Sequence, residues 1–235
     1  MISKIIHQIW IGPKKRPDIW MDTFKNDYIN NNQDWEYKLW DDTNISDLFD
    51  EFPTMLKIYN TERTYNGKSD LLRYLILYTY GGIYIDADSV WINNKSFDNL
   101  LSEVNKSKFF LAYEPNANSL CGGIMGSSKK NIYIKNLIDA VENIVKRGKE
   151  NKIHLIDYKR QSRIRGAANR IGPGLLTRLY LNNEEITKFP AIYFYPNGWH
   201  DKSRKIDSHI GLDLPKESYT YQYGYTTNSL ENLFK

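Results

Sequence analysis

The sequence predicts an α/β fold, in which helices cover a sheet. Short apolar runs such as residues 83–86 are typical of buried strands, and longer runs such as residues 131–148 repeat apolar residues at helical spacing. The two kinds of run alternate along the chain, as in a sheet flanked by helices. The 235 residues are enough for a sizeable core, and no linker or repeat divides them. We therefore expect a single domain over residues 1–235.

The first predicted elements are two strands. Residues 4–12 (KIIHQIWIG) predict a buried strand that ends at Gly12-Pro13. Residues 35–42 predict a second strand that runs into acidic residues, and one or two short helices are expected before residue 66.

The clearest helix is predicted at residues 69–82. Its leucines and isoleucine recur on one face, Ser69 is expected to cap its N-terminus, and Gly81-Gly82 its C-terminus. A short strand is expected directly afterwards, at residues 83–86.

The second half of the chain continues the alternation. Strands are expected at residues 109–115, 122–128 and 191–196, with the amphipathic helix 131–148 between the second and third. Residues 159–174 are expected to form a basic loop that contains glycine, before a short helix over residues 175–181.

Composition excludes several classes of protein. The net charge of +4 is spread thinly, so nucleic acid is not an expected partner, and the single cysteine, Cys121, excludes an intrachain disulfide and a cysteine cage for zinc. No segment approaches the ~20 apolar residues that span a bilayer, and the first strand leaves no room for a signal peptide. We therefore expect a cytoplasmic protein without a membrane span.

Two aspartates lie at the end of the predicted strand at residues 83–86: Asp86 is its last residue, and Asp88 comes two residues later. In an extended segment, residues i and i+2 project to the same side, so their carboxylates converge and repel unless a cation lies between them. Oxygen ligands suit Mg²⁺ or Mn²⁺, and ligands of open α/β sheets bind beyond the carboxyl ends of strands. The alternative is a surface turn in which both aspartates are solvated.

Neighbouring residues fit an anionic ligand. Asp70 and Arg73 share a face of the preceding helix, where a guanidinium near a helix N-terminus would suit a phosphate or ribose. A local ion pair on a solvated face is the alternative. Trp10 ends the first strand, where its indole could stack on a nucleobase or simply belong to the core.

The order of these motifs resembles the DXD-containing glycosyltransferase family. The resemblance lies in KIIHQIWIG, KSDLLRYLILYTYGGIYIDADSVW and IGPG, and this family includes initiating mannosyltransferases, capsular polysaccharide sugar transferases and the glucosyltransferase domains of clostridial toxins. It implies a GT-A type fold, in which a Rossmann-like, mostly parallel central sheet flanked by helices binds a nucleotide sugar through a divalent metal.

The resemblance also implies roles for individual residues. Asp86, Asp88 and Arg73 are expected to be catalytic, and Mn²⁺ or Mg²⁺ is expected on Asp88, with Asp86 nearby. A nucleoside diphosphate sugar is expected to contact Trp10 through its base, and Ser69, Asp70, Arg73, Tyr84, Asp86 and Gly172 through its ribose, sugar or phosphates.

The chain departs from the family pattern in two places. Gly122 and Gly123 stand where family members often carry asparagine, and the tail lacks the histidine-containing segment that ends in Ser-Trp. Asn228 is the expected third metal contact, with Gln222 and Ser229 as alternatives for a metal or phosphate contact.

The implied reaction moves a hexose from a UDP- or GDP-linked sugar to a glycan or other hydroxyl acceptor, with retention of configuration. The lack of a large targeting appendage favours a glycan over a host protein as acceptor. Two other functions stay open. The segment IYIDADSV fits a haloacid dehalogenase-type phosphatase with Asp86 as nucleophile and Asp88 as acid/base, and the altered tail fits a catalytically inactive nucleotide-sugar or glycan-binding module.

Overall fold

The computed structural model describes residues 1–150, 163–198 and 205–234. Within these ranges, six strands form a central sheet in the order β2-β1-β3-β6-β5-β7, and β4 pairs with β8 in a second, small sheet. The strands are β1 (Ile5–Ile9), β2 (Glu36–Trp40), β3 (Gly82–Ile85), β4 (Ser89–Trp91), β5 (Phe109–Tyr113), β6 (Leu120–Ser127), β7 (Thr187–Phe189) and β8 (Thr220–Gln222).

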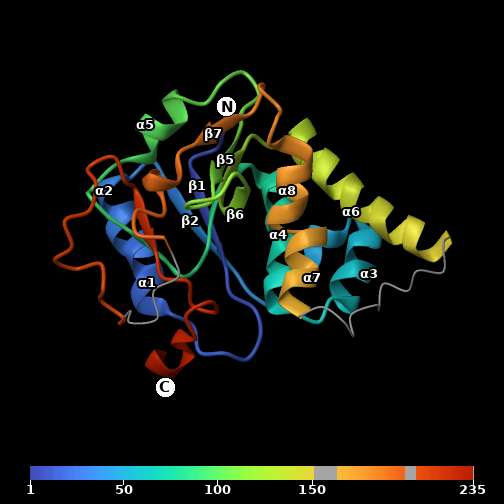
Figure 1. Cartoon of the computed structure of the whole chain (residues 1–235), viewed down its shortest axis with the longest axis horizontal. Helices are drawn as coiled ribbons and strands as arrows, with labels where there is room; N and C mark the ends of the chain where they lie inside the picture. Colours follow the sequence, from blue (N-terminus) through green and yellow to red (C-terminus); the bar gives the residue numbers. More distant parts are fainter. Residues whose placement is uncertain (151–162, 199–204, 235) are drawn as a thin grey trace.

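Helices lie on both sides of this sheet (Figure 1). The α-helices are α1 (Asp18–Asp22), α2 (Ile29–Asn31), α3 (Pro53–Thr61), α4 (Tyr65–Tyr80), α5 (Phe97–Ser102), α6 (Ile132–Glu150), α7 (Arg163–Arg170) and α8 (Pro173–Tyr180). A π-helical turn, η1 (Thr23–Tyr28), joins α1 to α2, and 3₁₀ turns lie at η2 (Ser46–Phe49), η4 (Ala191–Tyr193) and η5 (Leu230–Phe234). Figure 1 places α3, α4, α6, α7 and α8 together on one side and α1, α2 and α5 on the other.

The central sheet is mostly parallel, as expected from the sequence. β1 pairs in parallel with β2 and β3, and β5 pairs in parallel with β7. In the part of the chain that the structure describes, β6 is the sheet strand that runs the other way, antiparallel to β3 and β5. The α/β fold with a mostly parallel sheet is therefore confirmed.

Alternating side chains explain why a central strand such as β3 is apolar at nearly every position. Along β3, Ile83 and Ile85 belong to the core cluster beneath η1 and α5, whereas Tyr84 belongs to the cluster beneath α4. Successive strand residues point to opposite faces, so a sheet covered on both faces needs apolar residues at nearly every position. This arrangement fixes the carboxyl ends of β1 and β3 between two packed layers.

The predicted cap of the main helix is wrong. α4 begins at Tyr65, and its cap is Thr64, whose backbone is extended and whose hydroxyl accepts a hydrogen bond from Gly67 N at 3.1 Å. Ser69 therefore lies in the second helical turn, where it cannot cap the terminus. The predicted C-terminus is confirmed at Gly81, which has a φ of +69° that favours glycine.

Two predictions in the second half are also wrong. Residues 191–196 do not form a strand, because Pro190 has no N–H for a ladder and the chain turns at once into η4, with Tyr193 N donating to Pro190 O. The predicted basic loop 159–174 contains α7, where buried Ala167 packs against the core, and residues 159–162 lie outside the described residues.

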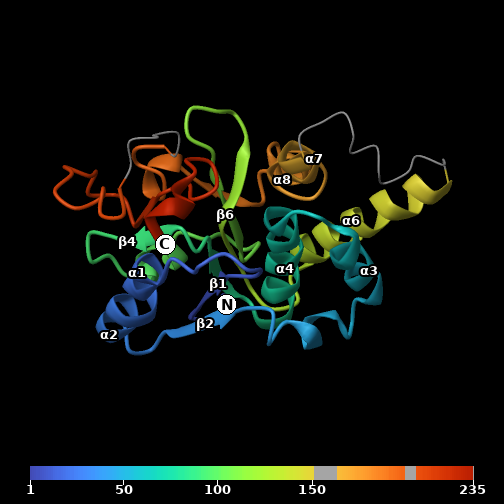
Figure 2. The same cartoon turned by 90° about the horizontal axis from the view of Figure 1, so that it is seen from below.

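The chain's last segment forms the second, small sheet with β4. β8 pairs antiparallel with β4, so residues 220–222 lie beside the segment that follows β3 (Figure 2). Trp20, Val90, Tyr221 and Tyr223 are among the residues of a separate apolar cluster that holds this segment in place. Among the described residues, no helix is long and apolar enough to cross a bilayer.

Candidate functional site

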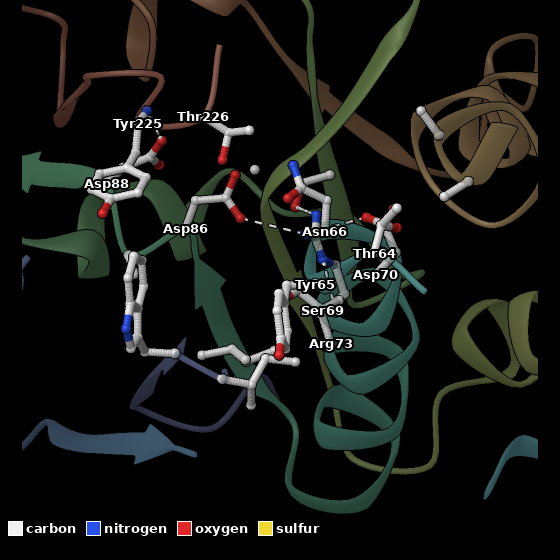
Figure 3. Close-up of a pocket in the computed structure, with 18 of the residues that line it drawn as sticks. Thr64, Tyr65, Asn66, Ser69, Asp70, Arg73, Asp86, Asp88, Tyr225 and Thr226 are labelled. Atoms are coloured by element: carbon white, nitrogen blue, oxygen red, sulfur yellow. Dashed lines mark hydrogen bonds and ion pairs between the residues drawn. The ribbon is translucent and has the colours of Figure 1, made fainter. Parts of the chain in front are cut away.

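A cavity of about 440 Å³ lies at the carboxyl ends of β1 and β3. Its lining includes Trp10, directly after β1, and the segment 86–88, directly after β3. Figure 3 shows Asp88 and Tyr225 on one side, the α4 residues Ser69, Asp70 and Arg73 on the other, and Asp86 between them. This is the position at which open α/β sheets bind ligands.

Arg73 is the central charge of the α4 wall. Its Nη2 lies 3.2 Å from an Asp70 carboxylate oxygen and 3.4 Å from Asp86 Oδ1. Asp70 and Arg73 are each only 6% exposed, so the pair is a buried network and not the solvated surface pair that was the alternative. Arg73 Nη1 also donates to Gly122 O, and its guanidinium lies 4.5 Å from the Tyr84 ring centroid. These contacts fix the guanidinium at the cavity wall.

Asp86 joins the α4 wall to the opposite wall. Its Oδ1 accepts a hydrogen bond from Tyr84 OH at 2.7 Å, and its Oδ2 accepts one from Gln222 Nε2 at 3.1 Å. Its backbone N donates to Gly123 O at 2.8 Å, which continues the pairing of β3 with β6. The carboxylate is therefore held from both sides.

The opposite wall comes from the C-terminal segment. Gln222 Nε2 also donates to Asp88 Oδ1 at 3.1 Å, and Tyr225 N donates to Asp88 Oδ2 at 2.7 Å. The Tyr225 ring meets Trp10 edge-on, with 5.3 Å between ring centroids. A tail segment far along the sequence thus completes the surroundings of Asp88 and Trp10.

Burial changes the acidity of two carboxyl groups. Burial raises the pKa of Asp70 to about 7, because the loss of hydration outweighs the attraction of Arg73. Burial raises the pKa of Asp88 to about 6, and the charge of Asp86 acts in the same direction. The hydrogen bonds from Tyr225 and Gln222 oppose this rise. Such shifts are concentrated at functional sites.

Two glycines allow groups to approach closely. A Cβ on Gly122 would lie 2.4 Å from Arg73 Nη1, and a Cβ on Gly172 would lie 2.4 Å from Asp70 Oδ2. No side chain can occupy this space without moving the charged groups. The glycine at position 122, where the family often has asparagine, is therefore matched to the position of Arg73.

The structure brings together most of the expected site residues. The cavity lining includes Trp10, Ser69, Asp70, Arg73, Tyr84, Asp86 and Asp88. Gly172 is not part of the lining; it caps α8 and packs against Asp70. Asn228 is not part of the lining either, and its buried side chain donates to Tyr223 O at 2.7 Å.

Other lining residues were not predicted from the sequence. Lys14, Arg63 and Tyr65 line the cavity, as do Tyr225 and Thr226 from the tail. The Tyr65 ring packs directly against Gly12, where a Cβ would lie 2.4 Å from the ring. No local sequence signal marks these residues, because their position depends on contacts between distant segments.

The donor set suits a hard divalent cation. The carboxylates of Asp86 and Asp88 lie on the same side of the chain, and both accept hydrogen bonds from the side-chain amide of Gln222. Mg²⁺ in proteins is commonly held by one or two carboxylates, with substrate phosphates completing its shell. Among the described residues, no group of three or more His, Cys, Asp or Glu side chains is placed to hold a metal.

Comparison with known sequences finds a family match in the first half of the chain. Residues 17–107 match the family model described as "Glycosyltransferase sugar-binding region containing DXD motif". Inositol phosphoceramide mannosyltransferase 3 of Schizosaccharomyces pombe is 38% identical over 88 residues, which are 37% of this chain and 24% of the relative. The initiation-specific alpha-1,6-mannosyltransferase of Candida albicans is 25% identical over 211 residues, which are 75% of this chain and 53% of the relative. The chain thus spans about half or less of the length of these relatives.

Comparison with solved structures supports the fold. The ligand-free glycosyltransferase domain from the YGT toxin has a TM-score of 0.56 at 10% identity, and 80% of each chain is covered. The UDP-bound form of that domain has a TM-score of 0.50 at 11% identity, covering 80% of this chain and 79% of the other. The resemblance drawn from the sequence is confirmed: residues 17–107 match the glycosyltransferase sugar-binding region that contains the DXD motif, and the fold is similar to that of glycosyltransferase domains.

Proposed function

We propose that this protein is a metal-dependent hexosyltransferase that uses a nucleoside diphosphate sugar. The observation that carries the proposal is the convergence of Asp70, Arg73, Asp86 and Asp88 on one cavity beside Trp10. The donor is a UDP- or GDP-linked hexose. The names of the two fungal relatives make mannose the first sugar to test, and the UDP-bound toxin domain makes UDP the first nucleotide to test.

Different residues of the cavity walls would bind different parts of the donor. Trp10 offers an indole face for the base, and Arg73 offers a fixed positive charge for the diphosphate. Asp70 holds Arg73 in place and lies close enough to the cavity to accept hydrogen bonds from sugar hydroxyls. Because Arg73 is preorganised, it stabilises negative charge that develops on the leaving diphosphate without having to move.

Asp88 and Asp86 would hold Mn²⁺ or Mg²⁺, which when bound supplies Lewis-acid stabilisation of that diphosphate. The proposed third contact is Asn228, from the tail, and phosphate oxygens of the donor would supply the others. An acceptor hydroxyl, on a glycan or another molecule, then receives the hexose with its configuration retained. We propose that the reaction takes place in the cytoplasm and within a single domain.

The decisive experiment measures nucleoside diphosphate release from UDP- and GDP-linked hexoses, with and without Mn²⁺. We expect release from one donor, dependent on metal, and at least about 100-fold slower in Asp88→Asn, in which a metal ligand is lost. The matched control is Asp34→Asn, because Asp34 is an exposed aspartate that pairs with Lys4 on the surface. Equal rates for the two variants would contradict the proposal.

The same assay separates the alternatives. A haloacid dehalogenase-type phosphatase would release inorganic phosphate from sugar phosphates without any nucleotide sugar. An inactive binding module would bind a donor and raise the melting temperature, but would release no nucleoside diphosphate.

A further inference from the structure

The side chain of Gln222 spans the two aspartates of the D-x-D motif. Its Nε2 lies 3.1 Å from Asp86 Oδ2 and 3.1 Å from Asp88 Oδ1. An amide nitrogen carries two hydrogens and can donate one to each carboxylate, whereas its oxygen would repel them. Gln222 is 7% exposed, so these bonds lie in a nearly dry environment, where they are stronger than in water.

The position of Gln222 is set by backbone pairing. β8 is antiparallel to β4 with Gln222 opposite Ser89, the residue after Asp88, and Tyr223 N donates to Asp88 O at 2.8 Å. A slip of one residue would turn the amide to the other face of the strand. Gly123 leaves room for the contact, because a Cβ there would lie 3.0 Å from Asp86 Oδ2.

The remaining carboxylate oxygens also have donors. Asp86 Oδ1 accepts from Tyr84 OH, and Asp88 Oδ2 accepts from Tyr225 N. Asp86 Oδ1 also faces Arg73 Nη2 at 3.4 Å, so its two lone pairs are both engaged. A carboxylate oxygen has two lone pairs, so the single bonds from Gln222 and Tyr225 leave a lone pair for a cation on Asp86 Oδ2 and on the Asp88 oxygens. The amide therefore offsets the repulsion between the two carboxylates without occupying all of their acceptor capacity.

We propose that Gln222 is a positioning residue that holds Asp86 and Asp88 side by side before a divalent metal binds. This inference rests on the metal dependence in the proposed function. Without the amide, the two carboxylates move apart to relieve their repulsion, and the metal must bring them together again. Outer contacts of this kind, which orient metal ligands, usually contribute 10- to 100-fold to affinity.

The test titrates metal-free protein with Mn²⁺ alone and follows binding by calorimetry. Gln222→Met keeps a side chain of similar length but loses both N–H groups, so we expect its dissociation constant for Mn²⁺ to rise about 10- to 100-fold. Gln222→Asn keeps the amide on a chain that is one methylene shorter and cannot reach both carboxylates. It should also bind Mn²⁺ more weakly, and it serves if the methionine variant does not fold.

The matched control is Thr220→Val, on the same strand. Thr220 is buried, and its Oγ1 donates to Phe194 O at 3.0 Å, away from the carboxylates. We expect this variant to lose stability but to bind Mn²⁺ as wild type does. Equal or tighter Mn²⁺ binding by folded Gln222→Met would overturn the inference, and so would wild-type protein that binds no Mn²⁺ in the absence of nucleotide. The metal dependence itself is decided separately, by nucleoside diphosphate release with and without Mn²⁺.

Discussion

The two walls of the cavity are built in different ways. The α4 wall carries Asp70 and Arg73 on a 16-residue helix whose neighbouring residues Leu71, Leu72 and Tyr74 are fully buried. The tail wall carries Gln222 at the end of a strand of only three residues. One wall is thus part of the main core, whereas the other depends on a short ladder and a separate apolar cluster.

This difference indicates that the site combines a fixed positive charge on the α4 side with a less stable segment on the tail side. Arg73 is buried among fixed partners, so the charge that faces the diphosphate is preorganised. The tail has fewer strand hydrogen bonds, and such segments open with a lower free energy than core helices. We therefore expect substitutions in the α4 wall to affect folding strongly, and substitutions in the tail wall to affect ligand binding more than folding.

The largest effect is expected for Arg73→Ala. The change leaves Asp70 and Asp86 without their buried counter-charge, which should lower the free energy of unfolding by about 3–5 kcal/mol in urea titrations. Arg178→Ala is the control, because Arg178 is exposed and its side chain donates to a backbone carbonyl, Asn169 O, and not to a carboxylate of the described residues. If both variants lost the same small amount, the α4 wall would not be the rigid side of the site.

The pH dependence of stability should reveal the buried carboxyl of Asp70. Folded protein keeps this proton up to about pH 7, whereas the unfolded chain releases it near pH 4, so the folded state binds more protons between these values. The contribution of Asp70 to the free energy of unfolding therefore falls as pH rises from about 4 to 7, by at most about 4 kcal/mol.

Asp70→Asn removes this dependence. We expect the difference in unfolding free energy between the variant and wild type to shift in favour of the variant as pH rises through that interval. Urea titrations at several pH values measure it, and a difference that stays constant with pH would show that Asp70 is ionised throughout.

A smaller effect is expected for Gly122→Ala. The added methyl group would lie 2.4 Å from Arg73 Nη1 and must displace the guanidinium, at a cost of about 1–3 kcal/mol. The control is the same change in an Arg73→Ala background. There the methyl group has space, so the two effects should not add. Additive losses would mean that the clash is not with Arg73.

The smallest effect is expected for Glu231→Gln in the tail. Glu231 pairs with Lys14 at 2.5 Å, but their side chains are 32% and 49% exposed, so the pair should contribute no more than about 1 kcal/mol. Urea titrations at low and high salt test this value. A large loss would show that the tail is held by charge and not by its apolar cluster.

Local sequence patterns were sufficient for the α4 wall. The main helix (predicted at residues 69–82 and observed at Tyr65–Tyr80), the strand β3 and the convergence of Asp86 and Asp88 all follow from patterns within about 20 residues of sequence. The spacing of apolar residues locates the body of a helix but not its first turn. The cap at Thr64 was missed because Ser69 is an equally good capping residue when only the sequence is considered.

The tail wall could not be predicted in this way. Gln222 was one of several candidates for a contact with the metal or phosphate, and its hydrogen bonds to Asp86 and Asp88 cross 136 and 134 residues of sequence. β4 and β8 have three residues each, too few to show an alternating pattern. Their pairing depends on Trp20 and Tyr223, which stack with 4.1 Å between ring centroids.

The sequence by itself determined the alternation of strands and helices, the α4 helix and the acidic pair, since each depends on residues close together in the chain. Only the tertiary structure decided that Arg73 is buried between Asp70 and Asp86, that Gly122 makes room for it, and that Gln222 reaches the acidic pair. Periodicity reports which face of an element is buried, but not which distant segment covers it. That choice is made by packing and by strand register, which no local pattern encodes.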